Sequence, residues 1–579
     1  MPDVTLSIRA EKIRFPEAPD GEISNMEKNA ILAAVLSLAV LVGWEFFYVR
    51  PQQEEALKKK QELAQREAAK APAPVVQGSP LAPPPKTLST QALAPAPSLA
   101  PAPAAKPAVA AKEKRVRVDV GSAIYEFTNI GAGMTSATLT KYLTDDRKKP
   151  IELIVGSSKL VRPLFFVGDE AAGRLNAAPY QVEGGDIQLT PSKPEGKLRF
   201  VYRDTTGLAA TKTFTFYYDS YVIGASIETG RPGTPKPMGI MWGPRLGGAG
   251  GNTYGGVVEG PMSFVDEDLI YDAPEKGKPA AHPAGTKWVS LQSKYFIAAL
   301  VPRGGEGGSE VRLLGGEGEK QEYAAAALLP KKSRSQATFD IYVGPKETGL
   351  LSKLNVSLEE SLDYGMFAII AKPLMYALRL FHGLTGNWGV AIILLTILIK
   401  LVFFPLTQIS MSNMRNMQKL QPKMTQLKEI YKDDKTKLNQ EVMALYKEHK
   451  VNPMMGCLPM VIQIPVFFGL YNSLLVSIEL RQAPFFWWIT DLSQQDPFHV
   501  FTILMGASMF LQQKMTPSTA DPAQAKMMML MPVVFTGMFV YYPVPVGLVI
   551  YWFMNNALSI LQQYYVNRSV KPPKLAEEN

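Results

Sequence analysis

The chain has 579 residues, a net charge of +9 and 46% hydrophobic residues, a composition that averages very apolar stretches with very polar ones. This length allows several domains, and the basic residues are dispersed among acids, which argues against a direct nucleic-acid site. A single cysteine, Cys457, excludes an intrachain disulfide framework, and four scattered histidines form no metal-binding pattern. With no phosphate loop or catalytic motif recognisable, we expect a protein that is not an enzyme and that uses no cofactor or metal.

The N-terminal part is predicted to be a membrane anchor followed by a tether. Residues 1–29 form a polar extension, and translation from Met26 is one hypothesis for its origin. Residues 30–49 are long and apolar enough to span a bilayer, and no small-residue cleavage site follows, which predicts an uncleaved anchor. Residues 50–111 contain a charged helix and then a linker with eleven prolines between 71 and 110, which is too poor in apolar residues to build a core.

Short runs of alternating polarity predict a β-sandwich domain over residues 112–355. Examples are RVRVDV (115–120), KTFTFYY (212–218) and ATFDIYV (337–343), with turn signals between the runs. The glycine-rich stretches 243–256 and 304–318 are interpreted as loops. A phosphate cradle, the alternative, needs a strand before the loop and a helix after it.

Residues 361–382 are apolar but interrupted by Lys372-Pro373 and by Arg379. These interruptions favour an amphipathic helix in the membrane interface over a complete span. A further helix of the soluble domain is the alternative.

Residues 387–407 have the length and apolarity of a second span, yet they contain Lys400. An ammonium at that depth costs about 2.5–3.5 kcal/mol on insertion scales, so its charge must face protein, water or a partner. The alternative is a lysine nearer the helix end that snorkels to the surface. Because the apolar run continues after Lys400, we interpret it as a functional intramembrane cation, with Thr396 one turn earlier on the same face.

Residues 408–453 are predicted to form a cytoplasmic helical hairpin. Apolar residues recur at steps of three and four on both sides of a charged turn, which indicates two helices packed along a seam. Residues 408–450 contain nine lysines and arginines against five acids. The exposed face is a candidate docking surface with these residues: Met411, Met414, Lys419, Lys423, Lys428, Lys432, Lys435 and Lys437.

Four further apolar segments complete a polytopic α-helical membrane protein of six spans. They are residues 454–480, 497–513, 527–542 and 546–566, followed by a tail at 567–579. The excess of basic residues in the hairpin and tail places both in the cytoplasm by the positive-inside rule. Both termini are then cytoplasmic, and the β-domain lies on the opposite side of the membrane.

Polar residues on several spans predict a hydrated concavity beside Lys400. Each alone is explained by a hydrogen bond between helices, but together they suggest a groove for a polar, acidic peptide segment. A small-solute transporter or channel is the alternative, although no inverted hydropathy repeat is visible. The predicted groove residues are Lys400, Thr396, Gln463, Asn472, Tyr551, Trp552, Asn555 and Asn556.

Several long motifs resemble the YidC family of bacterial membrane protein insertases. They include MEKNAILAAVLS, GNWGVAIILLTILIK, QPKMTQLKEIYKDDKTKLNQEVMALYKEHKVNPMMGCLPMVIQIPVF, ILMGASMFLQQKM and NNALSILQQ. The resemblance implies a five-helix insertase core and a periplasmic β-super-sandwich in a Gram-negative inner membrane. It implies insertion and folding of nascent proteins, alone or with the Sec translocon, with the ribosome, the signal recognition particle receptor and membrane lipids as further partners.

Two positions depart from the pattern of that family. Family members usually carry an arginine where this chain has Lys400, so the charge is kept but the bidentate guanidinium is lost. This departure favours a role for Lys400 as a point charge in water over a role as a fixed clamp for a carboxylate. A tyrosine pair of the family appears here as Tyr551-Trp552, which removes the second phenol from the groove.

Overall fold

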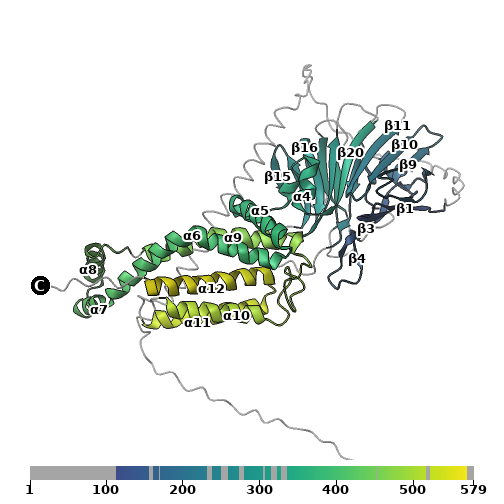
Figure 1. Ribbon diagram of the computed structural model, residues 1–579. Coiled ribbons are helices and arrows are strands. Elements are labelled where there is room, and N and C mark those ends of the chain that lie inside the picture. The colour runs from purple at the N-terminus through teal and green to yellow at the C-terminus, as the bar shows by residue number, and fades with distance from the viewer. Residues whose placement is uncertain are drawn as a thin grey trace, which may run out of the picture. The chain divides into compact units, whose positions relative to one another are not determined.

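A computed structural model describes most of the chain from residue 112 to residue 569 (Figure 1). The described ranges are 112–155, 161–168, 170–230, 238–248, 259–272, 279–303, 307–314, 322–327, 336–452, 454–516 and 522–569. All of them belong to one compact unit of the chain. The predicted extension, first anchor and linker, and all but the first three residues of the tail, lie outside the described residues and stay predictions.

The predicted β-domain is built from two main sheets, drawn in purple to teal in Figure 1. The first has five strands in the order β4-β3-β2-β1-β8. Its strands are β1 (Arg115–Asp119), β2 (Ala123–Thr128), β3 (Met134–Leu143), β4 (Pro150–Glu152) and β8 (Ile187–Gln188). A two-stranded sheet joins β5 (Ile154–Val155) to β13 (Arg245–Leu246).

The second main sheet has thirteen strands and is antiparallel along its central part. Its main path runs β6-β12-β19-β18-β16-β17-β20-β11-β10-β9-β7, and β14 and β15 pair beside β16. The strands are β6 (Phe166–Val167), β7 (Gln181–Glu183), β9 (Glu195–Arg203), β10 (Ala209–Tyr217), β11 (Val222–Gly230), β12 (Gly239–Trp242), β14 (Gly260–Val265), β15 (Asp268–Tyr271), β16 (Ala280–Gln292), β17 (Phe296–Arg303), β18 (Gly307–Leu314), β19 (Glu322–Ala327) and β20 (Gln336–Pro345).

Alternating side chains explain how the two sheets share a core. Along β10, every second residue is buried, and Phe214 and Phe216 of this row contact Phe127 of β2 with ring centroids 5.0 and 5.7 Å apart. A strand that presents one apolar face in this way must bury it against another layer. Lys212 belongs to the same buried row.

The prediction that residues 304–318 form a loop was wrong in part, since β18 covers Gly307–Leu314. β18 is paired on both sides, to β16 and to β19. Pairing with two neighbours satisfies the backbone and offsets the low strand propensity of glycine.

Among the described residues, eight long helices follow the β-domain, preceded by the short helices α3 (Glu170–Ala177) and α4 (Thr348–Leu351). They are α5 (Ala368–Thr385), α6 (Trp388–Lys419), α7 (Gln421–Ile430), α8 (Lys435–Glu448), α9 (Met454–Val476), α10 (Val500–Met515), α11 (Pro522–Tyr541) and α12 (Val546–Ser569). Among the described residues, the segments Gly365–Thr385 and Trp388–Lys419 are long and apolar enough to cross a membrane.

Helix α5 is less interrupted than its sequence suggests. The interfacial helix was predicted over 361–382, but 3₁₀ turns occupy Leu358–Ser361 and Gly365–Phe367 before α5 begins. Pro373 lies within the helix, whose buried residues are Ala371, Met375 and Leu378. The helix continues because a proline near its first turns removes only one backbone hydrogen bond.

Helix α6 extends beyond the predicted second span of 387–407 and passes through Pro405 without ending. Asn387 caps its start by accepting a hydrogen bond from the Val390 amide at 3.1 Å. The hairpin itself consists of α7 and α8. As the apolar stripe predicts, they pack together with the C-terminal end of α6 along a seam. Its residues are Met417, Leu420, Leu445, Tyr446 and Val451, with Met424, Leu427 and Val442 against it.

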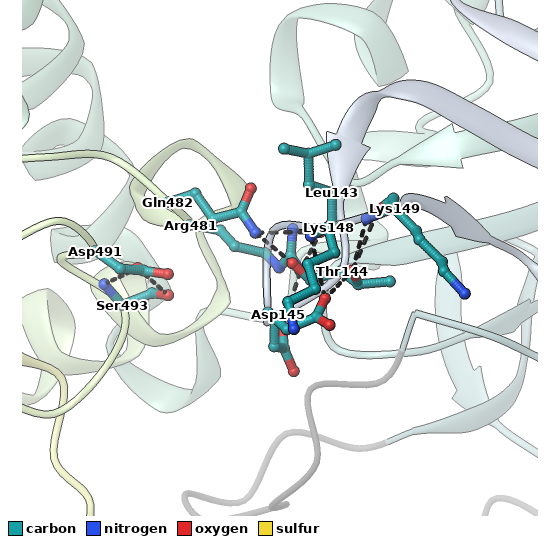
Figure 2. A network of polar contacts seen from close by, with 10 residues as sticks. Leu143, Thr144, Asp145, Lys148, Lys149, Arg481, Gln482, Asp491 and Ser493 are labelled. Atoms are coloured by element: carbon teal, nitrogen blue, oxygen red, sulfur yellow. Dashed lines mark hydrogen bonds and ion pairs between the residues drawn. The ribbon is translucent and has the colours of Figure 1, made fainter.

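The β-domain and the loop after α9 share a polar contact, shown in Figure 2. Arg481 donates to the Leu143 carbonyl at 2.7 Å and pairs with Asp145 at 2.9 Å. Gln482 donates to the carbonyls of Leu143 and Thr144 at 3.2 and 2.9 Å. These bonds join the end of β3 to the connector between α9 and α10.

Candidate functional site

Lys400 lies within α6 and points toward α12. Its Nζ donates to the Ser559 hydroxyl at 2.7 Å. No carboxylate lies within ion-pair distance of Lys400 in the part of the chain that the structure describes. Glu479, the acid near the end of α9, instead pairs with Arg379 of α5 at 3.1 Å. The lysine is therefore a cation held by a neutral partner.

A small cavity adjoins Lys400 between α6 and α9. It is lined by Ile399, Lys400, Phe403, Leu406, Thr407, Pro459, Ile462 and Gln463 and has a volume of about 20 Å³. A space of this size holds about one water molecule when polar groups are present to bind it. Lys400 and Gln463 supply those polar groups from opposite helices.

Helix α12 presents a row of polar residues toward this region. Tyr551, Asn555 and Ser559 follow one another at intervals of four, so they lie on one face of the helix. Gln463 of α9 donates to the Tyr551 hydroxyl at 3.1 Å and to the Asn555 side-chain oxygen at 3.0 Å. The Gln463 amide thus bonds to the first two residues of the row, Tyr551 and Asn555. Lys400 bonds to the third, Ser559.

Three of the predicted groove residues form hydrogen bonds elsewhere. Thr396 is fully buried and donates to the Ile392 carbonyl of its own helix at 2.7 Å. Asn472 donates to the Tyr364 carbonyl at 3.0 Å, and Asn556 donates to Ser508 of α10 at 3.1 Å. Thr396 lies one turn from Lys400, but its hydroxyl is used on its own helix. Asn472 bonds to the segment before α5 and Asn556 bonds to α10, so neither amide bonds to Lys400 or to the polar row of α12.

Trp552 makes aromatic contacts next to the polar row. Its ring lies 4.9 Å from that of Phe467 on α9 and 5.5 Å from that of Phe539 on α11, both edge-on. Edge-to-face pairs at these distances are favourable beyond the area that they bury. Trp552 therefore lies in an apolar aromatic cluster that adjoins the polar row.

Ser559 was missed at the sequence level, although a signal was available. It lies four residues after Asn555 and eight after Tyr551, so the helical period places it on the same face. A small serine between alanine, leucine and isoleucine is easily interpreted as a packing residue. Only the approach of α6 identifies it as the partner of Lys400.

The predicted docking residues of the hairpin are mostly accessible. Lys419, Lys423, Lys428, Lys432 and Lys437 are exposed, and the Lys435 side chain lies outside the described ones. Met411 and Met414 are partly buried on α6, outside the buried seam of the hairpin. The described residues contain no group of three or more His, Cys, Asp or Glu that could hold a metal ion.

Comparison with known proteins identifies the family of both domains. The family model described as "60Kd inner membrane protein" matches residues 380–574, and the one described as "YidC periplasmic domain" matches residues 115–377. A membrane protein insertase YidC of Citrifermentans bemidjiense is 38% identical over 560 residues, which cover 94% of this chain and 100% of that protein. A protein of the same name from Geobacter sp. strain M21 is 39% identical over 560 residues with the same coverage.

These matches confirm the resemblance drawn from the sequence motifs, and they favour an insertase over a transporter or channel. A third relative, the membrane protein insertase YidC of Syntrophus aciditrophicus, is 38% identical over 562 residues, with 94% of this chain and 100% of that protein covered. The chain therefore belongs to the YidC family of non-enzymatic membrane protein insertases, with a helical core in the inner membrane, a periplasmic β-domain and nascent membrane proteins as substrates.

Proposed function

We propose that the chain inserts nascent segments through a polar groove whose charged centre is Lys400 and whose neutral wall is Gln463, Tyr551, Asn555 and Ser559. The proposal rests on one observation: Lys400 lies within a span, and its hydrogen-bond partner among the described residues, Ser559, is uncharged. The amide and hydroxyl groups of the wall replace part of the hydration that a polar segment loses on leaving water. The ammonium adds attraction for acidic residues of that segment.

The expected size of this attraction follows from Coulomb's law. Two unit charges about 4 Å apart attract by about 4 kcal/mol at an effective dielectric constant of about 20. Desolvation of the carboxylate opposes part of this gain, so a net effect of about 1–2 kcal/mol, roughly tenfold in rate, is reasonable. The groove is thus proposed to favour acidic translocated tails over neutral ones.

The test compares Lys400→Ala and Lys400→Arg with the unmodified protein. Each variant is reconstituted and assayed for insertion of a single-span protein carrying either an acidic tail or the same tail with glutamines. We expect Lys400→Ala to slow insertion of the acidic tail about tenfold and the neutral tail much less, and Lys400→Arg to retain most activity. Unimpaired insertion of the acidic tail by Lys400→Ala would refute the electrostatic role.

We place the groove in a six-span protein with both termini in the cytoplasm, a periplasmic β-super-sandwich and the hairpin facing the cytoplasm. The excess of basic residues in the hairpin supports this orientation. Its exposed lysines support contact with ribosomal RNA or acidic surfaces of the Sec translocon or the signal recognition particle receptor, and with anionic lipid headgroups.

Reversal of charge at Lys419, Lys423 and Lys428 tests this docking surface. We expect weaker co-sedimentation of the detergent-solubilised protein with ribosomes that carry a stalled nascent membrane protein. The same change at Lys193, Lys197 and Lys287 of the β-domain is the control. Equal loss of binding in both sets would refute a specific role for the hairpin.

A further inference from the structure

The hydroxyl that meets Lys400 is itself hydrogen-bonded within α12. Ser559 is 6% exposed, and its hydroxyl donates to the Asn555 carbonyl one turn earlier at 2.8 Å. The Lys400 ammonium has only donors, so the Ser559 oxygen accepts its hydrogen bond while the Ser559 proton is used on its own helix. Serine back-bonding of this kind fixes the direction of the lone pairs.

A neutral acceptor holds an ammonium less firmly than a carboxylate does. Hydrogen bonds between two ionised groups are shorter and stronger than those to a hydroxyl, because Coulombic attraction adds to the bond. A carboxylate in the place of Ser559 would pair permanently with Lys400. A hydroxyl leaves the Lys400 charge without a counter-charge, so another acceptor can replace the hydroxyl.

We infer that Ser559 is a positioning residue, which holds the Lys400 ammonium in the groove until a carboxylate of the substrate replaces it. The inference rests on the proposed function, since it names the group that keeps the groove cation ready for an acidic segment. It assigns the specificity of the groove to a pair of residues: Lys400 supplies the charge, and Ser559 keeps that charge available. A purely structural role, in which Ser559 only fills space between α6 and α12, makes different predictions.

Three substitutions separate these roles. Ser559→Thr keeps the hydroxyl, Ser559→Ala removes it, and Ser559→Asp supplies a competing carboxylate. Each full-length variant is reconstituted and given the same single-span substrate with an acidic or a glutamine tail. The measured quantity is the ratio of acidic-tail to neutral-tail insertion rates, which cancels a general loss of active protein.

We expect Ser559→Thr to keep the ratio of the unmodified protein. Ser559→Ala should lower the ratio about threefold, because the ammonium loses its fixed position. Ser559→Asp should reduce the ratio to that of Lys400→Ala, because the internal ion pair neutralises the groove. Ser508→Asp is the matched control, since it places the same charge inside the bundle, on α10 against Asn556 rather than Lys400.

A second measurement follows Lys400 directly. The rate of its acetylation by a small amine-reactive reagent in nanodiscs is measured by mass spectrometry. We expect acetylation about threefold faster in Ser559→Ala and slower in Ser559→Asp, because the nitrogen attacks the reagent only after it loses a proton, and a hydrogen-bond acceptor or a carboxylate holds that proton. A space-filling serine would leave the rate unchanged across the three variants.

Equal acetylation rates in all Ser559 variants would overturn the inference, as would a ratio that Ser508→Asp lowers as much as Ser559→Asp does. The proposed function fails separately. If Lys400→Ala inserts acidic tails normally, the groove charge is unimportant for insertion, while the acetylation rates still decide whether Ser559 positions Lys400.

Discussion

Lys212 allows a quantitative prediction about the stability of the β-domain. It is fully buried on the inward row of β10, and its Nζ donates to the carbonyls of Gly131 and Leu164 at 2.9 and 2.7 Å. The ammonium also lies 4.2 Å from the centre of the Phe166 ring. Both hydrogen-bond acceptors are neutral, and burial lowers the pKa of Lys212 from 10.5 to about 7.

The lowered pKa makes stability rise with pH. Below about pH 7 the lysine is protonated in both the folded and the unfolded chain, so it adds no pH dependence. Between about 7 and 10.5 the unfolded chain keeps a proton that the folded chain has lost, so the free energy of unfolding increases. The rise amounts to about 2 kcal/mol between pH 7 and pH 9 and about 5 kcal/mol over the whole window.

Substitution Lys212→Met should remove this rise. It deletes the titrating group but leaves the Gly131 and Leu164 carbonyls without their donor, which costs about 1–3 kcal/mol at every pH. The assay is pulse proteolysis of the full-length protein in nanodiscs across a urea series at pH 7, 8 and 9. Cleavage within the β-domain gives its unfolding midpoint and hence its free energy of unfolding.

Lys141→Met is the control for loss of a lysine, because Lys141 is exposed and pairs with Asp219 on the surface. It should leave the pH dependence unchanged. The reasoning is refuted if the unmodified β-domain shows no rise between pH 7 and 9. It is equally refuted if the rise persists in Lys212→Met.

Three further predictions concern close contacts elsewhere. A Cβ on Gly506 of α10 would lie 2.0 Å from the Thr536 hydroxyl of α11. Gly506→Val should therefore destabilise the detergent-solubilised protein by about 1–3 kcal/mol. Gly537→Ala is the control: a Cβ there would meet no neighbouring atom within 4 Å, so the melting temperature of the protein should not fall. Leu445→Ala should weaken the hairpin seam by about 2–3 kcal/mol and speed limited proteolysis between α7 and α8, and unchanged cleavage would argue against the seam. Arg481→Gln should increase hydrogen exchange at the end of β3, because it removes a charge-assisted bond worth about 1.5–3 kcal/mol, and unchanged exchange there would contradict a stable joint.

Most of the architecture could be predicted from the sequence because it depends on local periodicity. Alternating polarity located the β-domain, and long apolar runs located the helices of the core. The seam of the hairpin followed from apolar residues at steps of three and four. Boundaries were less predictable: α6 continues through Pro405, because a proline removes one backbone bond without ending a helix that its neighbours support.

The candidate site could be predicted only in part. The sequence alone identified Lys400 as a costly charge in an apolar helix, since depth and length are local properties. It grouped Thr396, Asn472 and Asn556 with that lysine, because a polar residue in a span reveals nothing about the direction of its partner. In the structure, their hydrogen-bond partners are the Ile392 carbonyl, the Tyr364 carbonyl and the Ser508 hydroxyl, respectively.

What the sequence by itself determined, then, is the family, the division into a β-domain and a helical core, and the presence of a lysine inside a long apolar helix. Only the tertiary structure decided which group that cation meets. Lys400 and Ser559 are 159 residues apart, so their 2.7 Å contact depends on how α6 packs against α12. Helical periodicity defines the face on which a side chain lies, but the partner on that face is set by the packing of distant helices.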